Sequence, residues 1–175
     1  EIDSENFDAN HLLGILLIET QDFRTAEKYL TKSININPII PGAYNNLGVS
    51  LKEQGKPQEA IKKFTEAINL QNNYTDAYSN RGLTYILIKD FNSAIKDFNN
   101  VIKIKTDSIL AYNGLALSLY NIHNIDAALL NCNISIGIKK NLDALLIRGD
   151  IFYKRKNYVE AINNYKEAIN LDRSI

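Results

Sequence analysis

Apolar residues along the chain come in paired bursts, and each burst has the spacing of an amphipathic helix. Tyr44, Leu47 and Leu51 recur at intervals of three and four residues, which places them on one helical face. Ala60 and Phe64 continue with the same spacing in the burst that follows. The alternation of apolar and polar residues that is typical of strands is absent from the chain. The pattern therefore predicts helix–turn–helix units.

These paired bursts repeat with a period of 34 residues, shortened once to 33. Four columns of similar residues keep one phase throughout, and self-similarity of this kind is the signature of a repeat protein. The columns are Ala26, Ala60, Ala94, Ala128 and Ala161; Ala9, Ala43, Ala77, Ala111 and Ala144; Ile34, Ile68, Ile102, Ile136 and Ile169; and the small residues Gly14, Gly48, Gly82, Ala116 and Gly149. They divide the chain into five repeats, 7–40, 41–74, 75–108, 109–141 and 142–175, and we number the places of each repeat from its first residue.

Turn chemistry between the two bursts of each repeat supports the assignment. Gly55 stands where the end of a helix needs a left-handed residue, and Pro57 suits the first turn of the following helix. The corresponding junctions of the other repeats carry side chains that cap helix N-termini. These predicted N-caps are Asp22, Asp90, Asn124 and Asn157.

The small residues at the eighth place have a packing explanation. Glycine inside a helix costs roughly 1 kcal/mol relative to alanine, and this cost is offset where two helices approach closely. A column of larger residues at the twenty-fourth place could fill the gap. Its members are Leu30, Phe64, Phe98, Cys132 and Tyr165. Because one hairpin cannot bury such a face alone, neighbouring hairpins must stack.

The combination of Tyr44, Leu47-Gly48, Leu51, Ala60 and Phe64 at a 34-residue period resembles the tetratricopeptide (TPR) repeat. The resemblance covers residues 7–175. It implies an all-α fold, a right-handed superhelical solenoid of five TPR helix-turn-helix hairpins. We expect this to be a single domain over residues 1–175, and a piece of a longer protein because the sequence contains no Met.

Composition excludes several classes of function. Twenty basic and twenty acidic side chains give a net charge of zero, which argues against nucleic-acid and anionic-membrane surfaces. The pentatricopeptide repeats, which bind RNA, run near 35 residues and are usually basic, so we disfavour them. His11 and His123 stand in different repeats without a ligand set, and the single cysteine, Cys132, falls in the core column. We therefore expect no catalytic residue, no metal and no cofactor, and we favour a cytoplasmic location.

In a TPR-like stack the first helix of each repeat lines the concave wall, at the second, fifth, sixth, ninth and twelfth places. The resemblance thus implies a peptide-binding groove with amides beside an aliphatic strip. Asn46 and Asn80 are similar to the asparagine ladder of the TPR domain of O-GlcNAc transferase, in which amides hold a peptide backbone. The candidate groove residues are His11, Ile15, Asn45, Asn46, Val49, Ser79, Asn80, Leu83, Asn113 and Leu117. Asn is abundant throughout the chain, so the two asparagines could instead share a place by composition alone.

Chaperone-binding TPR domains use a carboxylate clamp of Lys, Asn and Arg to hold a C-terminal carboxylate. The matching places here hold His11, Ile15, Asn46, Asp76 and Asn80, so only the middle asparagine agrees. This argues against an Hsp70 or Hsp90 tail as the ligand.

We expect an interaction scaffold that binds a peptide segment of a protein partner in the concave groove. Two alternatives stay open. The chain could be the substrate-recruiting arm of a larger enzyme of the glycosyltransferase or methyltransferase type. It could also be a structural array that assembles end to end through the last hairpin, where Ile162, Tyr165 and Ile169 would need a neighbour.

Overall fold

The computed structural model describes residues 6–172, and within this range every regular element is an α-helix. The helices are α1 Phe7–Glu19, α2 Phe23–Ile36, α3 Pro41–Glu53, α4 Pro57–Leu70, α5 Thr75–Leu87, α6 Phe91–Ile104, α7 Ile109–Asn121, α8 Ile125–Ile138, α9 Leu142–Lys154 and α10 Tyr158–Asp172. Each predicted repeat holds two of them, so the all-α assignment is confirmed. The last three residues of the fifth repeat, 173–175, lie outside the described range.

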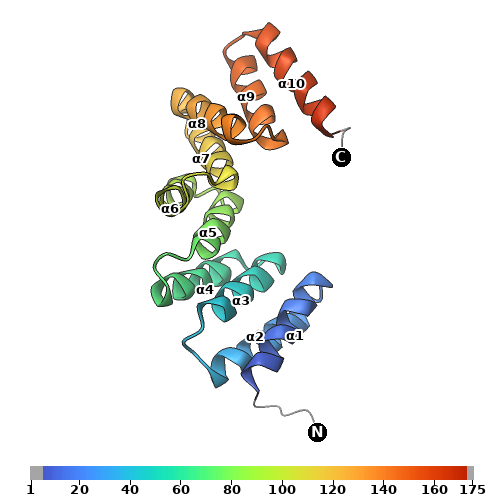
Figure 1. Cartoon of the computed structure of the whole chain (residues 1–175), viewed down its shortest axis with the longest axis vertical. Helices are drawn as coiled ribbons and strands as arrows, with labels where there is room; N and C mark the ends of the chain where they lie inside the picture. The colour runs from blue at the N-terminus through green and yellow to red at the C-terminus, as the bar shows by residue number, and fades with distance from the viewer. Residues whose placement is uncertain (1–5, 173–175) are drawn as a thin grey trace. The chain divides into compact units, whose positions relative to one another are not determined.

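The chain divides into two compact units, Glu1–Ile88 and Lys89–Ile175. The first contains α1 to α5 and the second α6 to α10, and both can be followed by colour in Figure 1. The boundary falls in the turn of the third repeat, between its two helices. That the five repeats form one continuous domain stays a prediction.

The turns follow the chemistry that the sequence predicts. Asp22 accepts a hydrogen bond from the backbone N–H of Thr25 at 3.2 Å, and Asp90 caps α6 in the same way. Asn124 and Asn157 accept from backbone N–H groups at the starts of α8 and α10. All four predicted N-caps are therefore confirmed.

Gly55 has φ 75°, as its predicted place at a helix end requires. Its N–H donates to the carbonyl of Lys52, and the N–H of Lys56 donates to that of Leu51. These two bonds define a Schellman motif, which satisfies the last carbonyl groups of a helix. The fifteenth place is also left-handed in the other four repeats, where the residues are Gln21, Lys89, His123 and Lys156.

Small residues in the first helices allow close packing against large residues in the second. A Cβ added at Gly48 would lie 2.6 Å from Cε1 of Phe64, and one at Gly149 would lie 2.5 Å from Cε1 of Tyr165. No side chain fits at such a distance unless the ring moves. The predicted pairing of the eighth and twenty-fourth places is therefore correct in these two hairpins.

The first helices lie on the inner side of each unit. In the first unit α1 contacts α3 and α3 contacts α5, and in the second unit α7 contacts α9. Among the described residues of the same units, α2 and α4 make no such contact, and neither do α8 and α10. The first helices of successive repeats are therefore closer together than the second helices. The residues of the first helices that point away from the second helices form the inner surface of each unit.

Candidate functional site

A row of polar side chains crosses the inner surface of the first unit, from α1 through α3 to α5. Nδ2 of Asn80 donates to Oδ1 of Asn45 at 3.0 Å, and Nδ2 of Asn45 donates to Oδ1 of Asn46 at 3.4 Å. Nδ2 of Asn46 lies 3.1 Å from Nε2 of His11. We call these four residues the polar row. The structure brings these four side chains together and bonds them to one another, so part of their hydrogen-bonding capacity is already in use.

His11 lies at the end of the polar row, and its ring has neighbours on two sides, Phe7 and Gly42. Its ring stacks at 5.3 Å from that of Phe7, and its Cε1 lies close to the position that a Cβ at Gly42 would occupy. Burial lowers the pKa of His11 below 6.5, against the opposing effects of Asp8 and the Gly42 backbone. The ring is therefore neutral near pH 7, and a neutral ring nitrogen can accept the hydrogen bond from Asn46.

An aliphatic strip lies beside the polar row, three or four residues farther along each first helix. Ile15 and Val49 are half-buried, and Leu83 is 36% exposed. Val49 also packs against the buried cluster of the first two hairpins. Ser79, the fifth-place residue of α5, is half-buried. In the first unit the predicted residues thus form an apolar surface next to a polar one.

Asn113 has a different role, although it occupies the same place as Asn45. Both side chains are buried, Asn45 at 6% exposure and Asn113 at 9%, but Nδ2 of Asn113 donates to Oδ1 of Asn141 at 2.9 Å. Oδ1 of Asn113 accepts from the hydroxyl of Ser135 at 2.6 Å. Since Asn141 is the N-cap of α9, these bonds fasten α7 to the turn between α8 and α9. The neighbouring Leu117 is half-buried on α7.

The second unit carries a cluster that the predicted residue set omits. Asp150, at the ninth place of α9, is exposed and accepts a hydrogen bond from the hydroxyl of Tyr165 at 2.7 Å. Nζ of Lys154 lies 5.2 Å from the centroid of the Tyr120 ring. Tyr153 is 63% exposed. The signal was visible in the sequence, because the aliphatic ninth-place column changes to an acid at Asp150.

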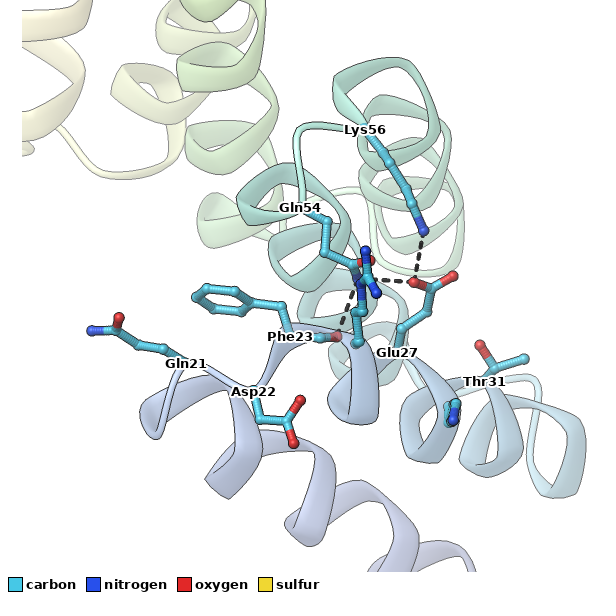
Figure 2. Close-up of a pocket in the computed structure, with 9 residues that line it drawn as sticks. Gln21, Asp22, Phe23, Glu27, Thr31, Gln54 and Lys56 are labelled. Carbon is cyan, nitrogen blue, oxygen red and sulfur yellow. Dashed lines mark hydrogen bonds and ion pairs between the residues drawn. The ribbon is translucent and has the colours of Figure 1, made fainter.

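A depression of about 1020 Å³ lies at the edge of the first unit, where the α1–α2 turn meets the α3–α4 turn. Figure 2 draws the residues that line it. Nε2 of Gln54 donates to Oε2 of Glu27 at 2.8 Å and to the carbonyl of Phe23 at 3.1 Å. Nζ of Lys56 pairs with the same Glu27 oxygen at 2.9 Å. Burial acts to raise the pKa of Glu27, but the bonds from Lys56 and Gln54 outweigh it and lower the pKa. The polar groups are thus paired with one another and join successive repeats.

Cys132 is fully buried in α8, and burial raises the pKa of its thiol to about 12. The thiol is therefore protonated at neutral pH and lacks the thiolate that a nucleophile requires. Residues 6–172 contain no group of three or more His, Cys, Asp and Glu side chains that could bind a metal ion. In the same range no helix has the length and apolar character to cross a membrane.

Comparison with family models identifies the repeats. Two family models are described as tetratricopeptide repeat. One matches residues 7–39 and 75–108, and the other matches residues 29–62. A third model, described as TPR repeat, matches residues 50–88 and 149–174. Together they cover most of the chain. A search of curated proteins found no match.

Solved structures share the fold. MamA from Desulfovibrio magneticus RS-1, residues 41 to the end, is 16% identical with a TM-score of 0.88, and the match covers 98% of this chain and 97% of that one. PilF of Pseudomonas aeruginosa is 18% identical with a TM-score of 0.85, over 94% and 75%. YrrB, described as a TPR protein with an unusual peptide-binding site, is 16% identical with a TM-score of 0.78, over 96% and 87%. At these identities the likeness concerns the fold alone.

Proposed function

Because the chain belongs to the tetratricopeptide repeat family, we propose that it is a protein-interaction scaffold. In this proposal the inner surface of α1, α3 and α5 holds an extended peptide segment of a partner protein. The observation that carries the proposal is the polar row, which runs across three successive first helices beside an aliphatic strip. The description of YrrB as peptide-binding is consistent with such a use of the fold.

The chemistry of the polar row suits the backbone of a peptide. A carboxamide has two N–H donors and an oxygen with two lone pairs. Asn80 uses one N–H within the row, while Asn46 uses one N–H and one lone pair, and both side chains are half-buried. The capacity that remains can serve both the carbonyl and the N–H groups of an extended chain. Such contacts do not depend on the peptide's sequence.

The bonds within the polar row also lower the cost of binding. A side chain that is already held by neighbours loses less rotamer freedom when a ligand arrives, and that loss is about 0.5–1.5 kcal/mol for each immobilised side chain. The row is therefore pre-organised. The strip formed by Ile15, Val49 and Leu83 then supplies apolar contact for alternate side chains of the peptide.

The test is selection from a library of short random peptides, followed by fluorescence anisotropy on the peptides that the chain retains. Leu83→Asp places a charge in the strip, and we expect it to weaken binding by about tenfold or more. Leu70→Asp is the matched control, because Leu70 is 43% exposed in the same unit but lies at the end of the second helix α4. Equal binding by both variants and the wild type would exclude the inner surface.

A further inference from the structure

The inner surface of the second unit differs in charge from that of the first. Ile15, Val49 and Leu83 hold the ninth place in α1, α3 and α5, but Asp150 holds it in α9. Asp150 has no ion-pair partner among residues 6–172. Lys154 follows it by four residues, at the spacing that favours an ion pair on a helix. Nζ of Lys154 instead lies 3.1 Å from Nδ1 of His123.

Two tyrosines, Tyr165 and Tyr120, interact with the Asp150 carboxylate. Tyr165 reaches it across Gly149 and donates its hydroxyl hydrogen to Oδ1. Burial, followed by this hydrogen bond and the charge of Asp150, raises the pKa of Tyr165 to about 12, with smaller contributions from Tyr120 and Tyr153. Burial and the Asp150 charge also raise the pKa of Tyr120. The charge of Asp150 thus acts on Tyr165 and on Tyr120, and Tyr165 also lies within electrostatic range of Tyr120 and of Tyr153.

We propose that Asp150 and Tyr120 form a subsite on the inner surface of α7 and α9 for the guanidinium group of an arginine side chain of a partner protein. The inference rests on the proposed function, since the arginine belongs to the partner that the scaffold binds. A guanidinium donates paired hydrogen bonds to a carboxylate and stacks on aromatic rings, and an ammonium ion matches this arrangement less well. Asp150 has an oxygen, Oδ2, with no hydrogen-bond partner in the described residues, and the Tyr120 ring is close enough to Lys154 for a cation–π contact.

The chain's own Lys154 supports the assignment and makes a second variant informative. Its ammonium group already lies 5.2 Å from the Tyr120 centroid, within the range of a cation–π contact. The Tyr120 ring is thus placed to attract a cation, and Lys154 competes with an incoming one. Removing this competitor by Lys154→Gln should tighten the binding of a cationic ligand, whereas Asp150→Asn should weaken it.

The experiment is a titration of the 15N-labelled chain with N-acetyl-arginine methylamide, followed by amide chemical shifts. The matched probe is the citrulline analogue, which has nearly the same shape but no charge. We expect the arginine probe to shift amides of α7 and α9 around Asp150, and the citrulline probe to leave them unchanged. Asp150→Asn should abolish the shifts. Asp107→Asn, the same change at an exposed acid in the α6–α7 loop, should preserve them.

Each outcome decides the inference. It is overturned if both probes shift the same amides equally, if neither shifts them, or if Asp150→Asn responds as the wild type does. The peptide-library selection then distinguishes a failure of the arginine subsite from a failure of the proposed function. Selected peptides without a preferred arginine, together with silent α7 and α9 amides, would overturn the subsite alone. Arginine-specific shifts with no selected peptide would overturn the proposed function and leave the subsite in place.

Discussion

Asparagine has three different roles in this chain, and its local surroundings determine which one applies. Asn124 and Asn157 cap helices through their side-chain oxygens. Asn113 is buried and joins α7 to the α8–α9 turn. Asn46 and Asn80 are half-buried members of the polar row. A substitution should therefore affect stability at some of these positions and binding at others.

Asn113→Ala is expected to lower the free energy of unfolding by about 1–3 kcal/mol, because it leaves the buried hydroxyl hydrogen of Ser135 without its acceptor and removes one of the donors to the Asn141 amide oxygen. Urea denaturation of the whole chain measures this loss. Asn99→Ala removes the same group at an exposed position of α6 and should have little effect. Equal losses for the two variants would contradict the fastening role of Asn113.

His11 gives a pH dependence whose sign follows from its lowered pKa. The unfolded chain takes up a proton at pH 6.5, while the folded chain does so only at lower pH. Between the two values the unfolded state binds more protons, so this contribution to stability falls as the pH falls below 6.5. We expect the melting temperature of the wild type to drop more between about pH 7.5 and about pH 5.5 than that of His11→Gln. Parallel curves would contradict the assignment.

At the scale of the helix pair, packing depends on glycine at the eighth place. Gly48→Ala would bring a Cβ to within 2.6 Å of the fully buried Phe64 ring. We expect a loss of about 1–3 kcal/mol of unfolding free energy, the usual cost of overpacking a core. Gly137→Ala is the control in α8, where a new Cβ meets no atom within 4 Å. It should be neutral or stabilise by up to about 1 kcal/mol through helix propensity, as measured in parallel denaturation curves.

The sequence was informative about elements because the repeat places each residue on a known helical face. The period predicted the helix pairs, and the turn chemistry predicted the N-caps and the left-handed Gly55. The hydrogen-bond partner of a side chain depends on the length of that side chain and on the residues of the neighbouring repeats. The position of a residue within its repeat does not determine its partner. Arg81 stands in the column of the buried Leu47, yet its Nη1 extends to Thr65 of the preceding repeat at 2.7 Å. For the same reason the bonds of Asn113 could not be predicted from its place.

At the scale of the whole molecule, stability and assembly depend on what covers each hairpin. Ile68 is 7% exposed and belongs to a buried cluster with Ala77 of the next repeat. Ile169 occupies the same place in α10 and is 52% exposed, and Ile162 on the same helix is 51% exposed. Two apolar side chains of this kind favour association with a complementary surface.

We expect the 175-residue chain to self-associate through this surface of α10, and sedimentation velocity over a range of concentrations tests it. Ile162→Lys combined with Ile169→Lys should shift the sedimentation coefficient to that of a monomer, because it places two charges in the contact. Ile138→Lys changes a residue of α8 that is 40% exposed and should leave the association unchanged. A wild type that is monomeric at every concentration would contradict the expectation.

The five hairpin turns share one left-handed position, yet only the second repeat fills it with glycine, at Gly55. The left-handed conformation costs other residues roughly 1–2 kcal/mol each, and the extra freedom of glycine in the unfolded chain offsets part of that gain. Glycine at Gln21, Lys89 or Lys156 could therefore add stability without changing a residue of the polar row or of the proposed subsite. Proteins of this kind that first acquire these glycines could then tolerate destabilising substitutions at their binding residues. Such proteins could change partner specificity and keep the fold.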